Sequence, residues 1–406
     1  MRNGGTTQED GADDRPGAEG GTGRSTADGP SRSRRRRLLT SAVAVALLAV
    51  GAAVPLVLAD SGDRPPCREI PASTRALADD PAAATRALDP GDDMSRYEAV
   101  RTLLRHEHSC GDGAEVLGRV VEAATVAAAP GTPHRTAQAR GAFAVTAALD
   151  GVDLPDAMAP SVARMLADYV VDEARYLTSD SDSAGPAVAP GTIEPDQHGW
   201  TEYGRFLAPG EAHTDFQYRD PLSGAEADPG DLIGELAKSP EAFAILYDAE
   251  RAYFAHYLER LTDEGADPDF RAVRRADDVY TSTGTTWPDN DLEDIAERVG
   301  ALMKHRAQHT RDGAIADLGA FDTAVGRHTR GVHRPAARQV TTRPPMGDIA
   351  ERAVSGPVRG DLTDGRHQLL TVLDDWAQAR GVPERRTSAM RQLIDDAYVR
   401  GLWMVV

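Results

Sequence analysis

Four residues with acid–base chemistry lie close together in a stretch without clear helical periodicity: His198, Glu211, His213 and Asp215. Histidine with aspartate or glutamate supplies the general acid and base of many enzymes, and the same side chains bind metal ions. Loops carry such groups more often than helix surfaces do. One hypothesis is therefore an envelope hydrolase or a metal-dependent enzyme that uses this stretch.

The same stretch also has a structural interpretation. Trp200, Tyr203, Phe206, Phe216 and Tyr218 are interspersed with its polar residues. Buried aromatic rings can fix a long connection to the core while the polar residues satisfy its turns. Because residues in one loop are weak evidence for an active site until their geometry is known, we favour the structural interpretation.

Two further groups have the spacing of ligands on one helical face. His106 and Cys110 are four residues apart in the sequence HEHSC, with His108 between them, and His305 and His309 are also four apart. A zinc protease needs glutamate directly after its first histidine, but arginine follows His305. The apolar residues near the second pair define a different face of the helix, so we expect that pair to be solvated. We expect no metal ion at either group.

The chain has two cysteines, Cys67 and Cys110, and both follow a long apolar segment. A cysteine pair on the outer side of a membrane is typically joined in a disulfide. We therefore predict a bond between these two residues, which would also remove the Cys110 sulfur from any metal site.

Motifs and charge exclude several classes of protein. The sequence has no G-x-S-x-G elbow, no GxxxxGK[ST] loop and no GxGxxG after a strand, so we expect no cofactor. Residues 60–406 contain 37 basic and 58 acidic residues, a net charge of −21. Such a surface repels nucleic acid, and we expect none as a partner.

Residues 38–59 form an uncharged, apolar run of 22 residues. As a helix this run would be about 33 Å long, enough to cross a bilayer. Arg34 to Arg37 precede it, whereas Asp60 and Asp63 follow it. The positive-inside rule then predicts a cytoplasmic N-terminus, an anchor in the lipid bilayer and an extracytoplasmic remainder.

A cleavable export signal is the alternative interpretation of this run. Arg35 to Leu39 are similar to a twin-arginine signal, and Val57 to Ala59 have the small-residue spacing of a cleavage site. The apolar run is longer than a usual signal core of roughly 7 to 15 residues, which favours a retained anchor. Cleavage after Ala59 would instead release a secreted helical effector.

Apolar residues at helical spacing predict an all-α fold, a bundle-like region after one transmembrane helix. We expect a disordered tail at residues 1–37, the membrane helix at 38–59, a tether at 60–80, a helical subdomain at 81–178, a linker with the aromatic and polar loop at 179–230, and a second helical subdomain at 231–406. The predicted helices are 94–109, 113–129, 134–149, 158–177, 239–261, 291–309, 315–327, 346–354, 366–380 and 383–403.

The order of these segments resembles that of uncharacterised actinobacterial single-pass membrane proteins: Arg34 to Arg37, a span rich in Ala, Val and Leu, and an acidic outer region rich in Ala and Arg. The resemblance implies a membrane location and assigns no catalytic residue. We therefore expect a non-catalytic binding module that contacts another envelope protein through its acidic surface or its aromatic loop. The sequence makes no prediction about the oligomeric state.

Overall fold

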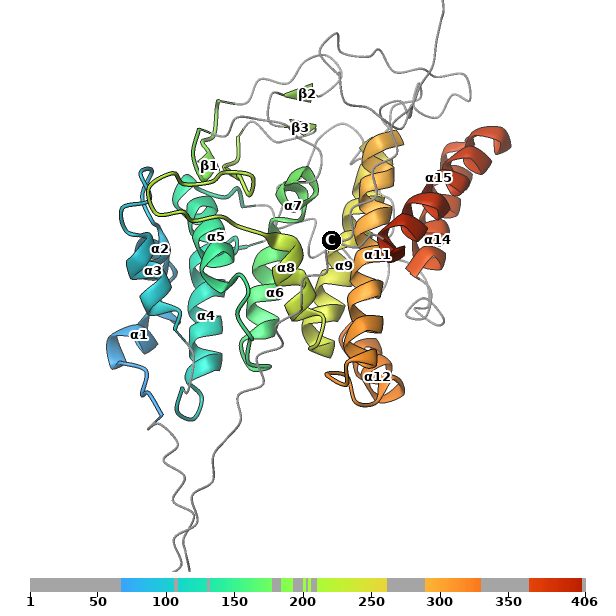
Figure 1. Cartoon of the computed structure of the whole chain (residues 1–406). Helices are drawn as coiled ribbons and strands as arrows, with labels where there is room; N and C mark the ends of the chain where they lie inside the picture. The colour runs from blue at the N-terminus through green and yellow to red at the C-terminus, as the bar shows by residue number, and fades with distance from the viewer. Residues whose placement is uncertain are drawn as a thin grey trace, which may run out of the picture. The chain divides into compact units, whose positions relative to one another are not determined.

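The computed structural model describes residues 67–105, 109–129, 132–176, 184–192, 200–201, 204–205, 210–260, 289–329 and 365–403. These residues are mainly helical, as the sequence predicts (Figure 1). Within these ranges, no helix is long and apolar enough to cross a membrane. The predicted membrane segment at 38–59 and the predicted helix at 346–354 lie outside the described residues.

Short helices make up the first half of the described chain. α2 packs on α4, and α4 packs on α5 and α6. The bounds are α1 (Ala72–Leu77), α2 (Pro81–Leu88), α3 (Tyr97–Leu103), α4 (Gly113–Thr125), α5 (Thr136–Leu149), α6 (Ala159–Asp168) and α7 (Val170–Tyr176). α1 lies in the segment predicted as a tether, and α3 is shorter than the helix predicted at 94–109. Met94 has φ +56°, a left-handed conformation that a helix cannot include, so α3 begins after it.

The single helix predicted at 158–177 is wrong, because the chain breaks at Tyr169 between α6 and α7. Tyr169 has φ −104° and ψ 22°, outside helical geometry. Its ring is fully buried, and its hydroxyl donates to the carbonyl oxygen of Thr125 at 3.1 Å. This contact with the end of α4 holds the break, which local periodicity does not reveal.

The second half contains the longest described helices, α9, α11 and α15. Its helices are α8 (Pro229–Leu236), α9 (Pro240–Arg260), α11 (Asp289–Arg311), α12 (Leu318–His328), α14 (Gly365–Arg380) and α15 (Glu384–Trp403). Aspartate caps start two of them, since the Asp228 carboxylate accepts from the Gly230 and Asp231 amides and Asp317 accepts from Ala320. α11 and α15 run close together (Figure 1) because each has glycine at the crossing. A Cβ atom on Gly401 would collide with the Glu297 carbonyl oxygen.

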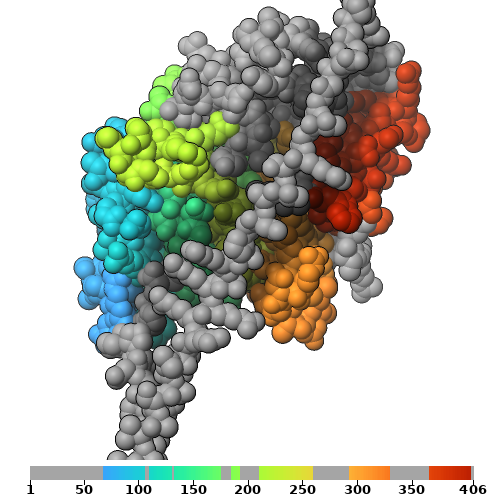
Figure 2. All heavy atoms as spheres, in the orientation of Figure 1, coloured from blue at the N-terminus to red at the C-terminus, as the bar shows by residue number. Residues whose placement is uncertain are grey.

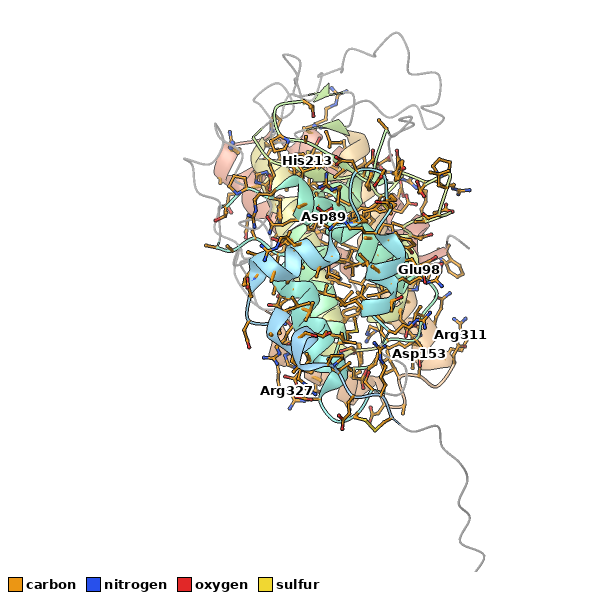
Figure 3. All side chains as sticks on the ribbon, turned by 90° about the vertical axis from the view of Figure 1, so that its left-hand side faces the viewer. Asp89, Glu98, Asp153, His213, Arg311 and Arg327 are labelled. Atoms are coloured by element: carbon orange, nitrogen blue, oxygen red, sulfur yellow. A yellow bond between two sulfur atoms is a disulfide. The ribbon has the colours of Figure 1, made fainter. Side chains whose placement is uncertain are left out.

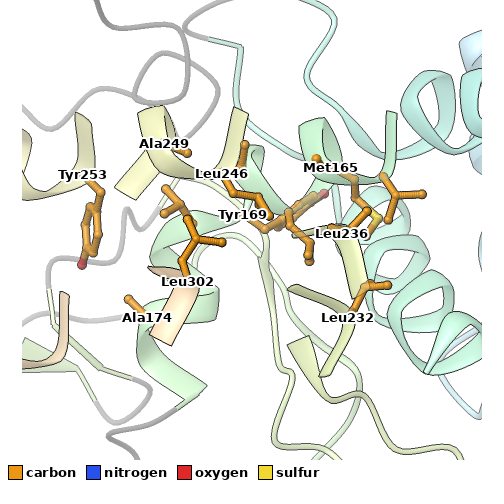
Figure 4. Packing of buried hydrophobic residues seen from close by; sticks show 14 of the residues in the cluster. Met165, Tyr169, Ala174, Leu232, Leu236, Leu246, Ala249, Tyr253 and Leu302 are labelled. Atoms are coloured by element: carbon orange, nitrogen blue, oxygen red, sulfur yellow. The ribbon is translucent and has the colours of Figure 1, made fainter. Parts of the chain in front are cut away.

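Two short antiparallel pairs of strands lie in the stretch predicted as a polar and aromatic loop. β1 (Ala187–Val188) pairs with β4 (His213–Thr214), and β2 (Trp200–Thr201) pairs with β3 (Gly204–Arg205). Below them, the apolar core is continuous from α2 to α15. Figure 4 shows part of this core, which includes Tyr169, Leu236 of α8 and Leu246 of α9.

A disulfide joins Cys67 to Cys110, which confirms the predicted pairing. The Cys110 amide also donates to the Arg68 carbonyl oxygen at 2.9 Å, and the Arg68 guanidinium donates to the Arg105 carbonyl oxygen at 3.0 Å. The bond closes a loop across a sequence separation of 43 residues, and so ties the start of the described chain to the residues before α4.

Replacing both cysteines, Cys67→Ser with Cys110→Ser, should lower the free energy of unfolding by about 4 kcal/mol, because the unfolded chain regains the entropy of the open loop. Urea unfolding of the full-length chain in mild detergent, followed by helical circular dichroism, measures this. Wild-type protein reduced and alkylated should show the same loss. A loss below about 1 kcal/mol would contradict a stabilising role for the bond.

Candidate functional site

Three of the four loop residues proposed for chemistry are inside the protein. Glu211, His213 and Asp215 are 1%, 0% and 2% exposed. The fourth, His198, lies outside the described residues. Figure 3 labels His213 near the short strands at one end of the helices. The three described side chains are therefore enclosed by the protein, and a substrate in solvent would not reach them.

Glu211 belongs to an ionic cluster centred on a histidine that the sequence did not single out. The His134 ring bonds Glu211 Oε1 through Nδ1 at 2.9 Å and Asp168 Oδ2 through Nε2 at 2.7 Å. Asp168 Oδ2 also accepts from the Ala127 amide at 2.7 Å. The cluster joins three segments: the residues before α5, the end of α6 and the residues before β4.

His134 carries a positive charge at neutral pH. Burial lowers the pKa of its imidazole, but hydrogen bonds and charge attraction from Asp168 and Glu211 outweigh burial and raise the pKa to about 9. With both ring nitrogens protonated, the ring donates to both carboxylates. Its face packs on Tyr169, with ring centroids 4.5 Å apart.

His213 lies in a second, separate pair. Its Nδ1 bonds Asp172 Oδ1 at 2.8 Å, and the other oxygen of Asp172 accepts from the Thr214 amide at 2.7 Å. The Thr214 hydroxyl donates to the Ala139 carbonyl oxygen at 2.9 Å. Asp172 thus holds β4 to α7, and Thr214 holds β4 to α5.

Asp215 organises a turn after β4. Its carboxylate accepts from the Gln217 amide at 3.2 Å, and its own amide donates to the Pro186 carbonyl oxygen at 3.1 Å. The neighbouring Phe216 is 1% exposed, and the Tyr218 ring lies 5.6 Å from that of Phe143. These contacts agree with the structural interpretation of the loop, in which aromatic residues fix it to the core.

The sequence predicts a solvated face for His305 and His309, but both side chains are half-buried and contact α8. His309 Nε2 bonds the Gly234 carbonyl oxygen of α8 at 2.7 Å, and a Cβ atom on Gly234 would lie 2.9 Å from the His305 ring. Burial, with smaller effects of Lys304 and His309, lowers the pKa of His305 to about 4. The sequence did not predict α8, so the partner of this histidine pair was missed.

Metal binding finds no support in the described part of the chain. No group of three or more histidine, cysteine, aspartate or glutamate residues there has the geometry to hold an ion. His106 and His108 lie outside the described residues, and the Cys110 sulfur is in the disulfide.

A further buried ionic cluster joins α7, α9 and α11. The Arg298 guanidinium forms ion pairs with Glu173 and Glu250, and all three side chains are less than 10% exposed. Burial raises the pKa of Glu173 well above its usual value, the charge of Glu250 adds to the rise, and Arg298 opposes it. A signal was present in the sequence, because Glu250 stands among the aromatic residues of its helix and Glu173 within an apolar stripe.

Raising the pH from about 6.5 to about 9 should lower the free energy of unfolding by about 3 kcal/mol. His134 binds its proton more tightly in the folded state, with a pKa of about 9, than in the unfolded chain, where the pKa is about 6.5. The stabilisation is therefore complete below pH 6.5 and is lost as the pH passes through the folded value. Urea unfolding at a series of pH values measures the slope.

A matched pair of variants identifies the group responsible. Glu211→Gln removes one carboxylate from His134 and should flatten the slope, and it should also cost about 3 kcal/mol at pH 6.5. Glu115→Gln, at an exposed position of α4, should keep the wild-type slope. Equal slopes in the two variants would contradict the assignment.

Comparison with known proteins gives no relative for this arrangement. No protein-family model matches the chain, and neither a curated protein nor a solved structure matches it.

Proposed function

We propose that the chain is a membrane-anchored extracytoplasmic protein whose helical region binds another protein of the cell envelope without catalysing a reaction. Residues 38–59 are the anchor, and residues 1–37 lie in the cytoplasm. The observation that carries the extracytoplasmic location is the bond between Cys67 and Cys110, because disulfides persist mainly outside the reducing cytoplasm.

The contacts of the polar loop favour binding over catalysis. A general acid or base must reach its substrate directly or through one water molecule. Glu211 and His213 instead contact His134 and Asp172 inside the protein, where each contact has a stabilising role.

An acidic surface beside α8 is the proposed binding surface. Burial raises the pKa of the Asp150 carboxyl, and the negative charges of Asp231, Asp228 and Glu226 raise it further. These three carboxylates therefore lie near Asp150. Leu222, on the loop before them, is 89% exposed. The yellow-green segment around these residues is at the surface in Figure 2. Arg219 of the same loop forms an ion pair with Glu226, so Asp228 and Asp231 supply the excess negative charge of this surface. Carboxylates beside an exposed leucine fit a basic partner with an apolar contact residue.

Crosslinking in living cells tests this function. A photoreactive amino acid at Leu222 of the full-length chain should capture a partner in the membrane fraction. Charge reversal, Glu226→Lys with Asp231→Lys, should lower the yield at least tenfold by placing like charges opposite a basic partner. Reversal at two exposed positions elsewhere, Asp79→Lys with Asp396→Lys, is the control and should leave the yield unchanged.

Two results would contradict the proposal. Equal yields from the two reversed proteins would rule out the acidic surface as the binding surface. Intact mass of the captured and free chain checks the anchor in the same samples. A culture-supernatant species that lacks residues 1–59 would overturn the anchor and support the released effector.

A further inference from the structure

A cavity of about 550 Å³ lies between α3 and the end of α5. Its lining includes Tyr97, Arg101, Arg105, Leu149, Asp150 and Val152. In Figure 3, Glu98 marks α3 and Asp153 marks the connection after α5, on the side that faces the viewer. His134 lies at the other end of α5, so the cavity is separate from the buried ionic cluster. Its volume is within the range of about 300–1,000 Å³ typical of small-molecule sites.

One side of the cavity offers hydrogen-bond donors to an anion. Arg101 and Arg105 are four residues apart at the end of α3. Arg101 forms an ion pair with Glu98 at 3.5 Å, and both side chains are more than half exposed. Arg105 forms no side-chain ion pair within the described ranges. Two guanidinium groups whose positive charges have so few carboxylate partners attract a carboxylate or phosphate.

Tyr97 adds a third donor from the cavity wall. Its side chain is only 7% exposed, and it lines the cavity. Burial also raises the pKa of Tyr97, so its hydroxyl keeps its proton and donates.

The other side of the cavity is negative. Asp150 follows α5 and forms no ion pair with a described residue, while burial and the charges of Asp231, Asp228 and Glu226 raise the pKa of its carboxyl. An ammonium group beside Asp150 would relieve this repulsion. Arg101, Arg105 and Asp150 all line this cavity, so the two poles border one space.

We propose that this cavity binds a small zwitterion, a free amino acid or a short peptide. The ligand carboxylate pairs with Arg101 and Arg105 and accepts from the Tyr97 hydroxyl, and its ammonium group pairs with Asp150. Its aliphatic part covers the apolar wall formed by Leu104, Leu149 and Val152. Asp150 lies near the proposed partner surface at Glu226 and Asp231, but that surface contributes no residue to the cavity lining. The titration with dipeptides needs no protein partner, so either proposal can fail without the other.

Calorimetric titration of the full-length chain with three dipeptides tests the site. L-alanyl-L-leucine carries both charges, its N-acetyl derivative only the carboxylate, and its amide only the ammonium group. Binding of the unmodified dipeptide should be saturable, and each blocked derivative should bind at least tenfold more weakly, because each loses one charge-assisted contact. Absence of saturable binding, or equal binding of all three, would overturn the proposal.

Variants assign the two poles. Arg105→Gln should weaken the unmodified dipeptide at least tenfold and leave the amide unaffected, whereas Asp150→Asn should weaken it similarly and leave the N-acetyl derivative unaffected. Tyr97→Phe keeps the ring and removes only the donor, and should weaken both carboxylate-bearing peptides. Arg119→Gln, at an exposed position of α4, is the matched control and should bind like wild type. Equal affinities in Arg105→Gln and Arg119→Gln would exclude this cavity.

Discussion

The charged ring of His134, closed off from solvent between two carboxylates, is the constraint around which the first half of the fold is arranged. Moving three ionisable groups out of water is costly, and the cost is offset only while all three remain in contact. Asp168 and Glu211 lie 34 and 77 residues from His134 in sequence. The cluster therefore forms only when α6, the start of α5 and the strand-forming loop have come together.

The contacts around this cluster extend the same constraint. Tyr169, which packs on the His134 ring, interrupts the helix, so that Asp168 ends α6 while Asp172 lies in α7 and bonds His213. Glu173, the residue directly after Asp172, forms an ion pair with Arg298 of α11. The acidic side chains of Asp168, Asp172 and Glu173 thus connect the start of α5, β4 and α11. The polar loop before and within β4, whose sequence resembles an active site, is part of the core.

Local patterns predicted most of the helices but few of these contacts. Ser239, Pro240 and Glu241 located the start of α9, and helical periodicity located α11, α14 and α15, because both signals depend on neighbours in sequence. The contribution of His134 was missed because its partners are distant in sequence, and no local pattern marks it. Charged residues within apolar stripes were the available signal for Glu173 and Glu250, since a helix buries such a residue only beside an opposite charge or a hydrogen-bond partner.

The charge of His134 is the most direct measure of this account. Nitrogen-15 chemical shifts of the histidine rings, recorded against pH on the full-length chain in detergent, report it, and the resonance missing from His134→Gln identifies the ring. Both nitrogens of His134 should remain protonated through pH 8 and titrate at about pH 9. A ring that loses its proton near pH 6.5, like a histidine in water, would contradict the buried cation and the organisation of the fold around it.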